Sequence, residues 1–382
     1  MRARGRVRWP VLVAVLALSV GCTAACTTVP ACAAGVRTAR LLPAFFATLP
    51  VDPSAWLARP VQAERLALQE APERVELHIW RPRSGRYPAL VVSLGVNPAP
   101  PDDPRVTRLF RGLARAGLVA VLVEQQALNE DRLTPAAPAA IVRAVERVRA
   151  FPSVRDGRVG LLGFSVGAAL VEIAAADPRI RDHVTVVEGF GGYARLADLV
   201  QAATTGVIQY RGHTEPWQPD PMTVRIVREN LIADLPDPRE RDALWQALVA
   251  ETTPLPPSDT LSAYGRAVLA LLTNTDPDRF HALFAALPER RRQEFEALSP
   301  VYVLDRIRAR VFLMHDRGDP LIPYVESRRS RDRLSEAGNP PYYSEFAIFE
   351  HVDPTRGGNP RILVRDGLRL FLHAYWVLRE LE

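Results

Sequence analysis

The stretch of sequence that decides the fold is RVGLLGFSVGAALVEIAAADP, which runs from Arg158 to Pro178. The apolar residues before Gly163 predict a buried strand, and the run rich in alanine, leucine and valine after Gly167 predicts a helix. Between the two stands Gly163-Phe164-Ser165-Val166-Gly167, which fits the pattern Gly-x-Ser-x-Gly. On so tight a turn the backbone of a serine is strained and its hydroxyl is exposed, and the flanking glycines let strand and helix approach closely. The alternative is a glycine-rich turn in which Ser165 merely caps the helix.

Strand and helix patterns alternate along most of the chain. Apolar strand patterns occur in YPALVVSLG (87–95), LVAVLVEQ (118–125) and DHVTVVEGFGG (182–192), and helix patterns lie between them. Fully apolar strands that alternate with helices indicate a mostly parallel sheet with helices on both faces. The pattern becomes almost wholly helical from residue 195 to 298, before a further strand pattern begins at ARVFLMH (309–315). Insertions of this length usually cover a site.

The sequence therefore predicts one α/β domain that is split by a helical lid. The boundaries that we expect are a leader at 1–21, a tether and N-terminal extension at 22–72, the first part of the core at 73–194, the lid at 195–298 and the second part of the core at 299–382. In the early strand pattern ERVELHIWRP, Val75, Leu77 and Ile79 alternate toward the core, and His78 is expected at the surface or at a sheet edge.

The N-terminus has the pattern of an export signal. A basic segment, MRARGRVRW, precedes the apolar run PVLVAVLALSVG, which is of signal-peptide length and short for a membrane span. The small residues before Cys22 resemble a bacterial lipoprotein cleavage site, so we expect Cys22 to carry a lipid. Two alternatives stay open, namely cleavage at Ala31-Cys32-Ala33 and retention of residues 7–29 as a marginal span. We expect the protein to be exported and anchored at the membrane, on the outer side of the cytoplasmic membrane or in the periplasm.

Composition excludes several classes of function. The 382 residues contain no lysine, and the four arginines among the first eight residues account for all but one of the formal net charge of +5. The body is therefore close to neutral, and aromatic residues make up only 7% of the chain, which argues against a nucleic-acid partner. All three cysteines lie at or before Cys32, so the folded body has no thiol nucleophile or thiolate metal site. We find no metal-binding or nucleotide-binding motif and expect no cofactor.

A serine nucleophile needs a base, and the base needs an acid that orients it. With Gly-x-Ser-x-Gly placed after a strand and before a helix, the chain resembles the α/β-hydrolase superfamily, and within it the dienelactone-hydrolase-like and esterase branches. Dienelactone hydrolases use a cysteine where this chain has Ser165. The resemblance covers residues 73–382 outside the lid. It implies an α/β-hydrolase fold whose catalytic residues come in the order serine, acid, histidine.

The resemblance implies an acid after a late strand and a histidine after the last one. In ARVFLMHDRGDPLIP (309–323), the spacing His-x-x-x-Asp-x-x-Ile-Pro looks like the acid loop of these enzymes and places the acid at Asp319. Asp316 competes for this role, although we interpret it as a solvated turn carboxylate. His351 follows the alternating pattern SEFAIFEH and precedes a loop rich in proline and glycine, so it is the candidate base.

An oxyanion hole needs two hydrogen-bond donors. The resemblance implies the N–H of Val166 as one donor and the loop after YPALVVSLG as the source of the other, where Val96 or Gly95 can serve. Many family members carry His-Gly there, and this chain has Leu94-Gly95 instead. Gly95 is thus expected beside the substrate. Glu188, at the end of a buried strand, is expected either to contact the substrate or to cap the hinge of the lid.

These residues predict a serine hydrolase that cleaves a carboxylic ester, or a related acyl bond, of a small-molecule substrate through an acyl-enzyme. Ser165, His351 and Asp319 form the expected triad. Two alternatives stay open. In the first, the chain is a catalytically weak ligand-binding protein of the envelope. In the second, it uses the same residues to transfer the acyl group to an acceptor other than water. Sequence alone does not separate transfer from hydrolysis, and it leaves the oligomeric state open.

Overall fold

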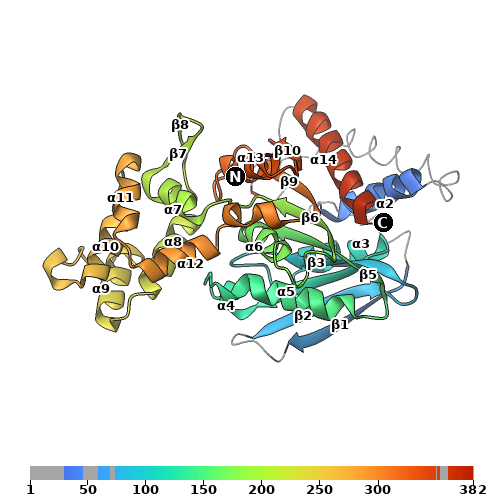
Figure 1. The fold of residues 1–382 in the computed structure, drawn as a ribbon, viewed down its shortest axis with the longest axis horizontal. Helices are drawn as coiled ribbons and strands as arrows, with labels where there is room; N and C mark the ends of the chain where they lie inside the picture. Colours follow the sequence, from blue (N-terminus) through green and yellow to red (C-terminus); the bar gives the residue numbers. More distant parts are fainter. Residues whose placement is uncertain (1–29, 46–58, 69–73, 350, 353–359, 382) are drawn as a thin grey trace, which may run out of the picture.

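The structure is a computed structural model that describes residues 30–45, 59–68, 74–349, 351–352 and 360–381 (Figure 1). The predicted leader, the proposed lipid-bearing Cys22 and the alternative span at residues 7–29 lie outside the described residues. Within the described ranges, none of the helices combines the length and the hydropathy that a membrane crossing requires.

An eight-stranded sheet forms the centre of the molecule. Its strands lie in the order β1 (Val61–Leu68), β2 (Val75–Pro82), β4 (Val119–Gln125), β3 (Tyr87–Ser93), β5 (Val154–Phe164), β6 (Val184–Phe190), β9 (Arg310–Asp316) and β10 (Tyr342–Phe346). In the sheet order from β4 to β10, each strand is parallel to its neighbour. Strand β2 is antiparallel to both of its neighbours, β1 and β4. The carboxyl ends of the parallel strands therefore meet at one edge of the sheet, where ligands bind in this architecture.

Helices cover both faces of the sheet (Figure 1). One face carries α5 (Ala136–Arg149), α6 (Val166–Ala175) and α13 (Val325–Glu336), and the other carries α2 (Pro30–Phe45), α3 (Pro104–Arg115) and α14 (Pro360–Leu381). The strands are apolar on both sides because successive side chains enter opposite layers. In β3, for example, Val91 packs in the first layer and Val92 in the second. The predicted α/β-hydrolase fold is confirmed.

The chain between β6 and β9 forms a largely helical lid that extends from one end of the sheet (Figure 1). Its helices are α7 (Leu196–Thr205), α8 (Pro221–Ala233), α9 (Pro238–Leu248), α10 (Ala263–Leu272), α11 (Phe280–Ala285) and α12 (Glu289–Ala297). The lid has an apolar core of its own, which includes Leu231, Leu271 and Phe280. Two of its helices begin with proline after an aspartate, where Asp220 and Asp237 accept hydrogen bonds from N–H groups of the first turn.

Two short strands in the lid are not predicted by its helical pattern. β7 (Val207–Tyr210) and β8 (His213–Pro216) form an antiparallel hairpin, whose turn residues Arg211 and Gly212 both have positive φ. Such a turn is typical of tight hairpins, and an arginine before a glycine is a weak signal for it. The strand β1 also lies outside the core boundary expected at residue 73, because this edge strand is largely exposed and lacks an apolar run.

Glu172 is a buried titratable group in this core, on the side of α6 that faces α13. Burial raises the pKa of its carboxyl from an ordinary value of 4.5 to about 8, against the opposing effect of a 3.3 Å hydrogen bond from the Ser330 hydroxyl. The folded protein therefore keeps a proton that the unfolded chain releases above about pH 4.5. This group consequently makes the free energy of unfolding fall as the pH rises from that value toward 8.

Glu172→Gln removes this titration. When the pH rises from 5 to 8, the free energy of unfolding of the variant should increase by about 2–4 kcal/mol relative to that of the wild type. Urea unfolding at both pH values measures this change. Glu296→Gln, on the exposed surface of α12, is the control and should leave the pH dependence unchanged. The same pH dependence in Glu172→Gln and in the wild type would contradict the prediction.

Candidate active site

Ser165 stands on the turn between β5 and α6, as the sequence predicts. Its backbone has φ 56° and ψ −134°, a conformation that costs a residue other than glycine about 1–3 kcal/mol. Its N–H donates to Phe190 O at 2.8 Å, which ties the turn to β6. Although Ser165 occupies the position directly before the helix, its side chain makes no capping hydrogen bond. The interpretation as a capping serine is therefore wrong, and the hydroxyl is left at the positive end of the helix dipole.

Three backbone segments crowd around this turn, and each needs a glycine. A Cβ on Gly163 would lie 2.3 Å from Gly167 O, and a Cβ on Gly167 would lie 2.3 Å from Ser93 O, both far inside van der Waals contact. Gly95, in the loop after β3, has φ 90° and would place a Cβ 3.2 Å from Val166 N. The absence of these side chains is what lets β5, α6 and the loop after β3 meet.

The candidate base and acid form a buried pair beyond the carboxyl ends of β10 and β9. His351 Nδ1 lies 2.6 Å from Asp319 Oδ2, and both residues are buried. The other carboxylate oxygen of Asp319 accepts hydrogen bonds from the N–H groups of Leu321 and Ile322, at 2.8 and 3.1 Å. The carboxylate is thereby fixed within its own loop, and Oδ2 is turned toward the imidazole.

His315 is a second histidine beside the acid. Its Nε2 lies 3.0 Å from Ile322 O and 3.2 Å from Asp319 Oδ2, and its Nδ1 lies 2.7 Å from the Ser327 hydroxyl. Since a carbonyl only accepts, Nε2 carries a proton. Burial by itself raises the pKa of Asp319, but the charge of His351 and the hydrogen bonds from both histidines outweigh burial and hold this pKa well below its usual range. The Asp319 carboxylate therefore stays ionised.

Asp316, the competing acid, is fully buried rather than solvated as the sequence analysis expects. One of its carboxylate oxygens accepts from the Gly318 N–H and the other from the Phe349 N–H, each at 2.8 Å. These bonds join the turn after β9 to the segment that leads to His351. Asp316 thus helps to position the base, and Asp319 is the carboxylate that meets the imidazole.

A cavity of about 530 Å³ lies between these residues and the lid. Ser165 and His351 both line it, together with the loop after β3 and the lid helices α7, α8 and α12. Most of the lining side chains are apolar, among them Val96, Leu109, Leu133, Phe164, Leu196, Leu199, Ile226, Leu231 and Phe295. Among the described residues, no carboxylate lines the cavity. The cavity is therefore suited to an apolar, uncharged group beside the serine.

The two candidate oxyanion donors lie on neighbouring segments. Val166 occupies the first position of α6, where backbone N–H groups have no partner within the helix. Val96 follows Gly95, which packs against the Val166 amide, and both valines line the same cavity as the serine. The next amide of the loop is already used, because the Asn97 N–H donates to Leu128 O at 3.0 Å. Val96 therefore stays the candidate for the second donor.

Glu188 does not reach this cavity, contrary to the expected contact with a substrate. Its Oε2 lies 2.8 Å from His373 Nε2, and His373 Nδ1 lies 2.9 Å from Ser344 Oγ, in a buried polar row between β6, α14 and β10. Side chains alternate along a strand, so Glu188 enters the layer of α14 while its neighbour Gly189 faces Glu172 on α6. The residue is part of the packing behind the site.

The lid is hydrogen-bonded to the loop that carries the candidate acid. Three groups of the lid donate to three successive carbonyls of that loop: Trp217 Nε1 to Asp319 O (2.9 Å), Asp220 N to Pro320 O (2.7 Å) and Thr223 Oγ1 to Leu321 O (3.0 Å). Sequence reasoning misses these residues because the partners lie about a hundred positions apart and no motif marks them.

Known proteins resemble the chain in structure and not in sequence. No protein-family model and no curated protein matches it. Similar solved structures include a Pyrococcus horikoshii acylaminoacyl peptidase, with a TM-score of 0.47, 12% identity and coverage of 81% of this chain and 40% of that one. A Mycobacterium tuberculosis puromycin-hydrolyzing peptidase gives a TM-score of 0.49, 16% identity and coverage of 87% and 41%. Est1E from Butyrivibrio proteoclasticus gives a TM-score of 0.47 and 10% identity, and the match covers 83% of this chain and 98% of Est1E.

The chain thus spans about two fifths of the length of the two peptidases and nearly the whole of Est1E. At these identities and TM-scores, the similarity carries no information about the substrate or the reaction of this protein.

The crowding around the serine can be tested by adding one methyl group. Gly167→Ala places a Cβ 2.3 Å from the Ser93 carbonyl oxygen, and neither backbone can retreat without opening the turn. We expect the free energy of unfolding to fall by about 3 kcal/mol or more, measured by urea unfolding.

Gly367→Ala is the matched control, since nothing lies within 4 Å of a Cβ built at that position of α14. This variant should be neutral or more stable by up to about 1 kcal/mol, because alanine favours a helix more than glycine does. Equal unfolding midpoints for the two variants would show that the crowding does not constrain the fold.

Proposed function

We propose that the protein is a serine hydrolase that cleaves a carboxylic ester, or a related acyl bond, through an acyl-enzyme on Ser165. One observation carries the proposal. A strained serine without a capping role shares an apolar cavity with a buried histidine, whose Nδ1 is held by an ionised carboxylate. Backbone strain and a buried charge both cost free energy, and such costs are typical of functional sites.

In the proposed reaction, the Ser165 hydroxyl attacks the acyl carbon while His351 Nε2 takes its proton. Asp319 accepts the hydrogen bond of the Nδ1–H, selects that tautomer and stabilises the imidazolium. The N–H groups of Val166 and Val96 donate to the oxyanion of the tetrahedral intermediate. His351 then gives its proton to the leaving oxygen, and the alcohol departs. Water attacks the acyl-enzyme by the same route, which releases the carboxylic acid and restores Ser165.

The lining of the cavity favours a substrate whose acyl part is apolar and uncharged. Its volume of about 530 Å³ lies within the range of pockets that enclose drug-sized molecules. No carboxylate of the described lining can pair with an ammonium group, which argues against a peptide bound by its free N-terminus. The two arginines of the lining already pair with acids, Arg105 with Asp103 and Arg291 with Glu294, each at 2.9 Å. An apolar ester therefore fits better than an aminoacyl substrate.

Acyl transfer and ligand binding without turnover would use the same cavity. Transfer requires an acceptor that reaches the acyl-enzyme before water does, and binding alone requires an unreactive Ser165. Ser165 has a strained backbone and makes no capping hydrogen bond, which favours a catalytic role over ligand binding alone.

A fluorophosphonate probe tests the nucleophile directly. We expect the wild type to be labelled at Ser165, located by mass spectrometry of the digested protein, and Ser165→Ala to remain unlabelled. Hydrolysis of short p-nitrophenyl esters by this variant should fall by at least about a thousandfold in kcat. Ser93→Ala, which removes a buried hydroxyl at the end of β3, is the control that keeps the label. Robust turnover by Ser165→Ala, or a folded wild type that takes no label, would contradict the proposal.

The assignment of the acid gives a second prediction. Asp319→Asn keeps the side-chain shape but stabilises the wrong imidazole tautomer, so we expect kcat to fall by about a thousandfold to ten-thousandfold. Asp316→Asn turns an amide N–H toward a backbone N–H, so it should lower the free energy of unfolding by about 1–3 kcal/mol and kcat by less than about tenfold. A larger loss of kcat in Asp316→Asn than in Asp319→Asn would make Asp316 the acid.

A further inference from the structure

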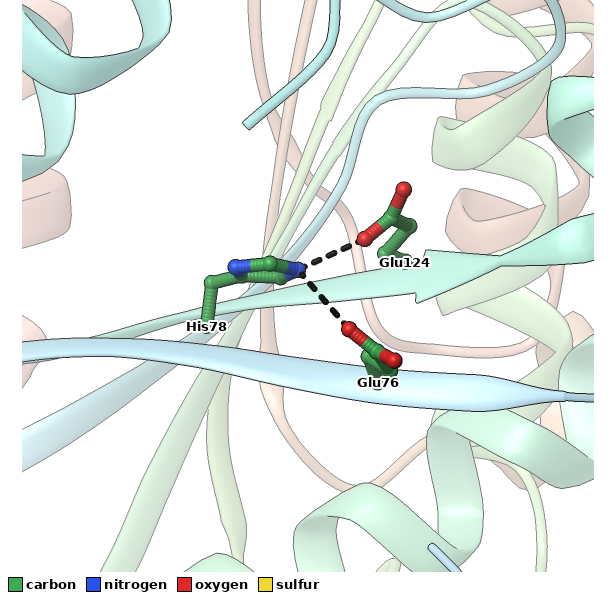
Figure 2. Close-up of side chains that lie close together, drawn as sticks. All are labelled: Glu76, His78 and Glu124. Atoms are coloured by element: carbon green, nitrogen blue, oxygen red, sulfur yellow. Dashed lines mark hydrogen bonds and ion pairs between the residues drawn. The ribbon is translucent and has the colours of Figure 1, made fainter. Parts of the chain in front are cut away.

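A second cluster of titratable side chains lies on β2 and β4, outside the cavity. Glu76 and Glu124 are direct partners in the antiparallel ladder, and His78 lies two residues along β2 and therefore on the same face. Figure 2 shows one ring nitrogen of His78 directed toward both carboxylates. This Nε2 is 2.6 Å from Glu124 Oε2 and 3.9 Å from Glu76 Oε2, and one ligand atom from each side chain lies within 4.8 Å of the others.

The outer carboxylate oxygens are held by other residues. Arg74 Nη2 donates to Glu76 Oε1 at 2.6 Å, and Asn129 Nδ2 donates to Glu124 Oε1 at 2.9 Å. Asn129 is the last residue of α4 (Gln126–Asn129), the short helix that follows β4 directly. Each carboxylate is thereby oriented so that its Oε2 faces His78. Hydrogen bonds to the second oxygen orient carboxylate ligands in the same way at metal sites.

His78 is buried, in contrast to the surface or edge position that the sequence predicts. Only 5% of its side chain is exposed, because β1 and β4 flank β2 and α3 packs on it. Within the described part of the chain, its Nε2 contacts no polar group other than the two carboxylates. A buried imidazole nitrogen directed at two carboxylates either donates its N–H to one of them or binds a metal ion between them.

Two carboxylates directly opposite each other in a ladder repel, and a cation between them removes that repulsion. Arg74 does not fill that place, because its guanidinium binds the outer oxygen of Glu76 and 75% of its side chain is exposed. An ion about 2.0–2.2 Å from one nitrogen and two oxygens requires ligand atoms about 3.3 Å apart in tetrahedral geometry. The separations of 2.6 and 3.9 Å from Nε2 lie on either side of that value, and all three ligand atoms lie within 4.8 Å of one another, so side-chain rotations have to bring them to this spacing.

We propose that Glu76, His78 and Glu124 bind a divalent transition-metal ion of the Zn²⁺ type, with water completing its coordination. One imidazole nitrogen and two carboxylate oxygens suit such an ion, whereas Ca²⁺ takes six to eight oxygens and Mg²⁺ favours octahedral oxygen ligands. The ion displaces any proton on Nε2 when it binds. No sequence motif marks the site, because Glu124 lies 46 positions from His78 and joins it only through the pairing of β2 with β4.

The proposed metal site borders the loop that carries the candidate oxyanion donor. Glu124 and Asn129 line a small hollow together with Gly95 and Pro98 of that loop. None of the three metal ligands lines the cavity of the serine. A bound ion therefore joins β2 to β4 behind the loop and stabilises the fold, and it takes no part in the acyl chemistry.

Metal binding can be tested on the purified full-length protein after dialysis against EDTA. We expect one equivalent of Co²⁺ to give the visible absorption of a tetrahedral site, and one equivalent of Zn²⁺ to abolish it. Zn²⁺ should also raise the midpoint of thermal unfolding, since a ligand that binds only the folded state stabilises it. Mg²⁺ and Ca²⁺ at the same concentration should leave the midpoint unchanged.

Three substitutions locate the ion. Glu124→Gln and Glu76→Gln keep the side-chain shape and should each weaken Zn²⁺ binding by at least about a hundredfold in calorimetric titration, and Asn129→Ala should weaken it about tenfold. Glu64→Gln is the matched control, because it removes an exposed carboxylate of β1 that pairs with Arg81, and it should bind Zn²⁺ like the wild type. Circular dichroism verifies that each variant is folded.

Two results would overturn the metal site. A folded wild type whose spectrum and unfolding midpoint do not respond to Co²⁺ or Zn²⁺ would show that His78 Nε2 only makes a hydrogen bond to Glu124. Equal Zn²⁺ affinities for the wild type and Glu124→Gln would place the ion elsewhere in the protein.

Discussion

The geometry of the site depends on how closely three backbone segments approach one another beside Ser165. Strand β5, helix α6 and the loop after β3 meet at Gly163, Gly167 and Gly95, where a side chain would overlap the opposing backbone. The neighbours β3 and β6 hold β5 on both sides, so the turn cannot relax by moving the strand. The strain in the serine backbone is therefore maintained by the whole sheet. The same approach brings the loop after β3 against the first amide of α6.

The parallel strands also place Asp319 and His351 at the same edge of the sheet. Their position after the strand ends does not by itself align the two side chains. Asp319 is held by two amides of its own loop and contacts two histidines, which together keep its carboxylate ionised despite burial. Asp316 links that loop to the segment before His351. The alignment of acid and base is thus a product of buried hydrogen bonds between loops that follow different strands, and the catalytic roles proposed above depend on it.

The sequence was informative where a residue is marked by its immediate neighbours. Ser165 stands between two glycines, and Asp319 and His351 each follow a strand pattern, so the resemblance to the α/β-hydrolase superfamily was enough to predict that these two side chains meet. It was uninformative where the partner is distant in the chain. The pairing of Glu188 with His373, the burial of Asp316 and the burial of His78 all follow from packing between separate elements. The exposed strand β1 and the hairpin of the lid were missed because short or exposed strands have weak patterns.

The hydrogen bonds from Trp217, Asp220 and Thr223 to the acid loop have a consequence for how this protein can change. Thr223, one of these three residues, also lines the cavity beside Ser165, so one segment of the lid both shapes the cavity and fixes the main chain around Asp319. A lid that swung away as a unit would break these three hydrogen bonds and release three carbonyls of that loop. Substitutions that reshape the cavity near this segment therefore also shift Asp319, and under the proposed function selectivity and turnover would change together.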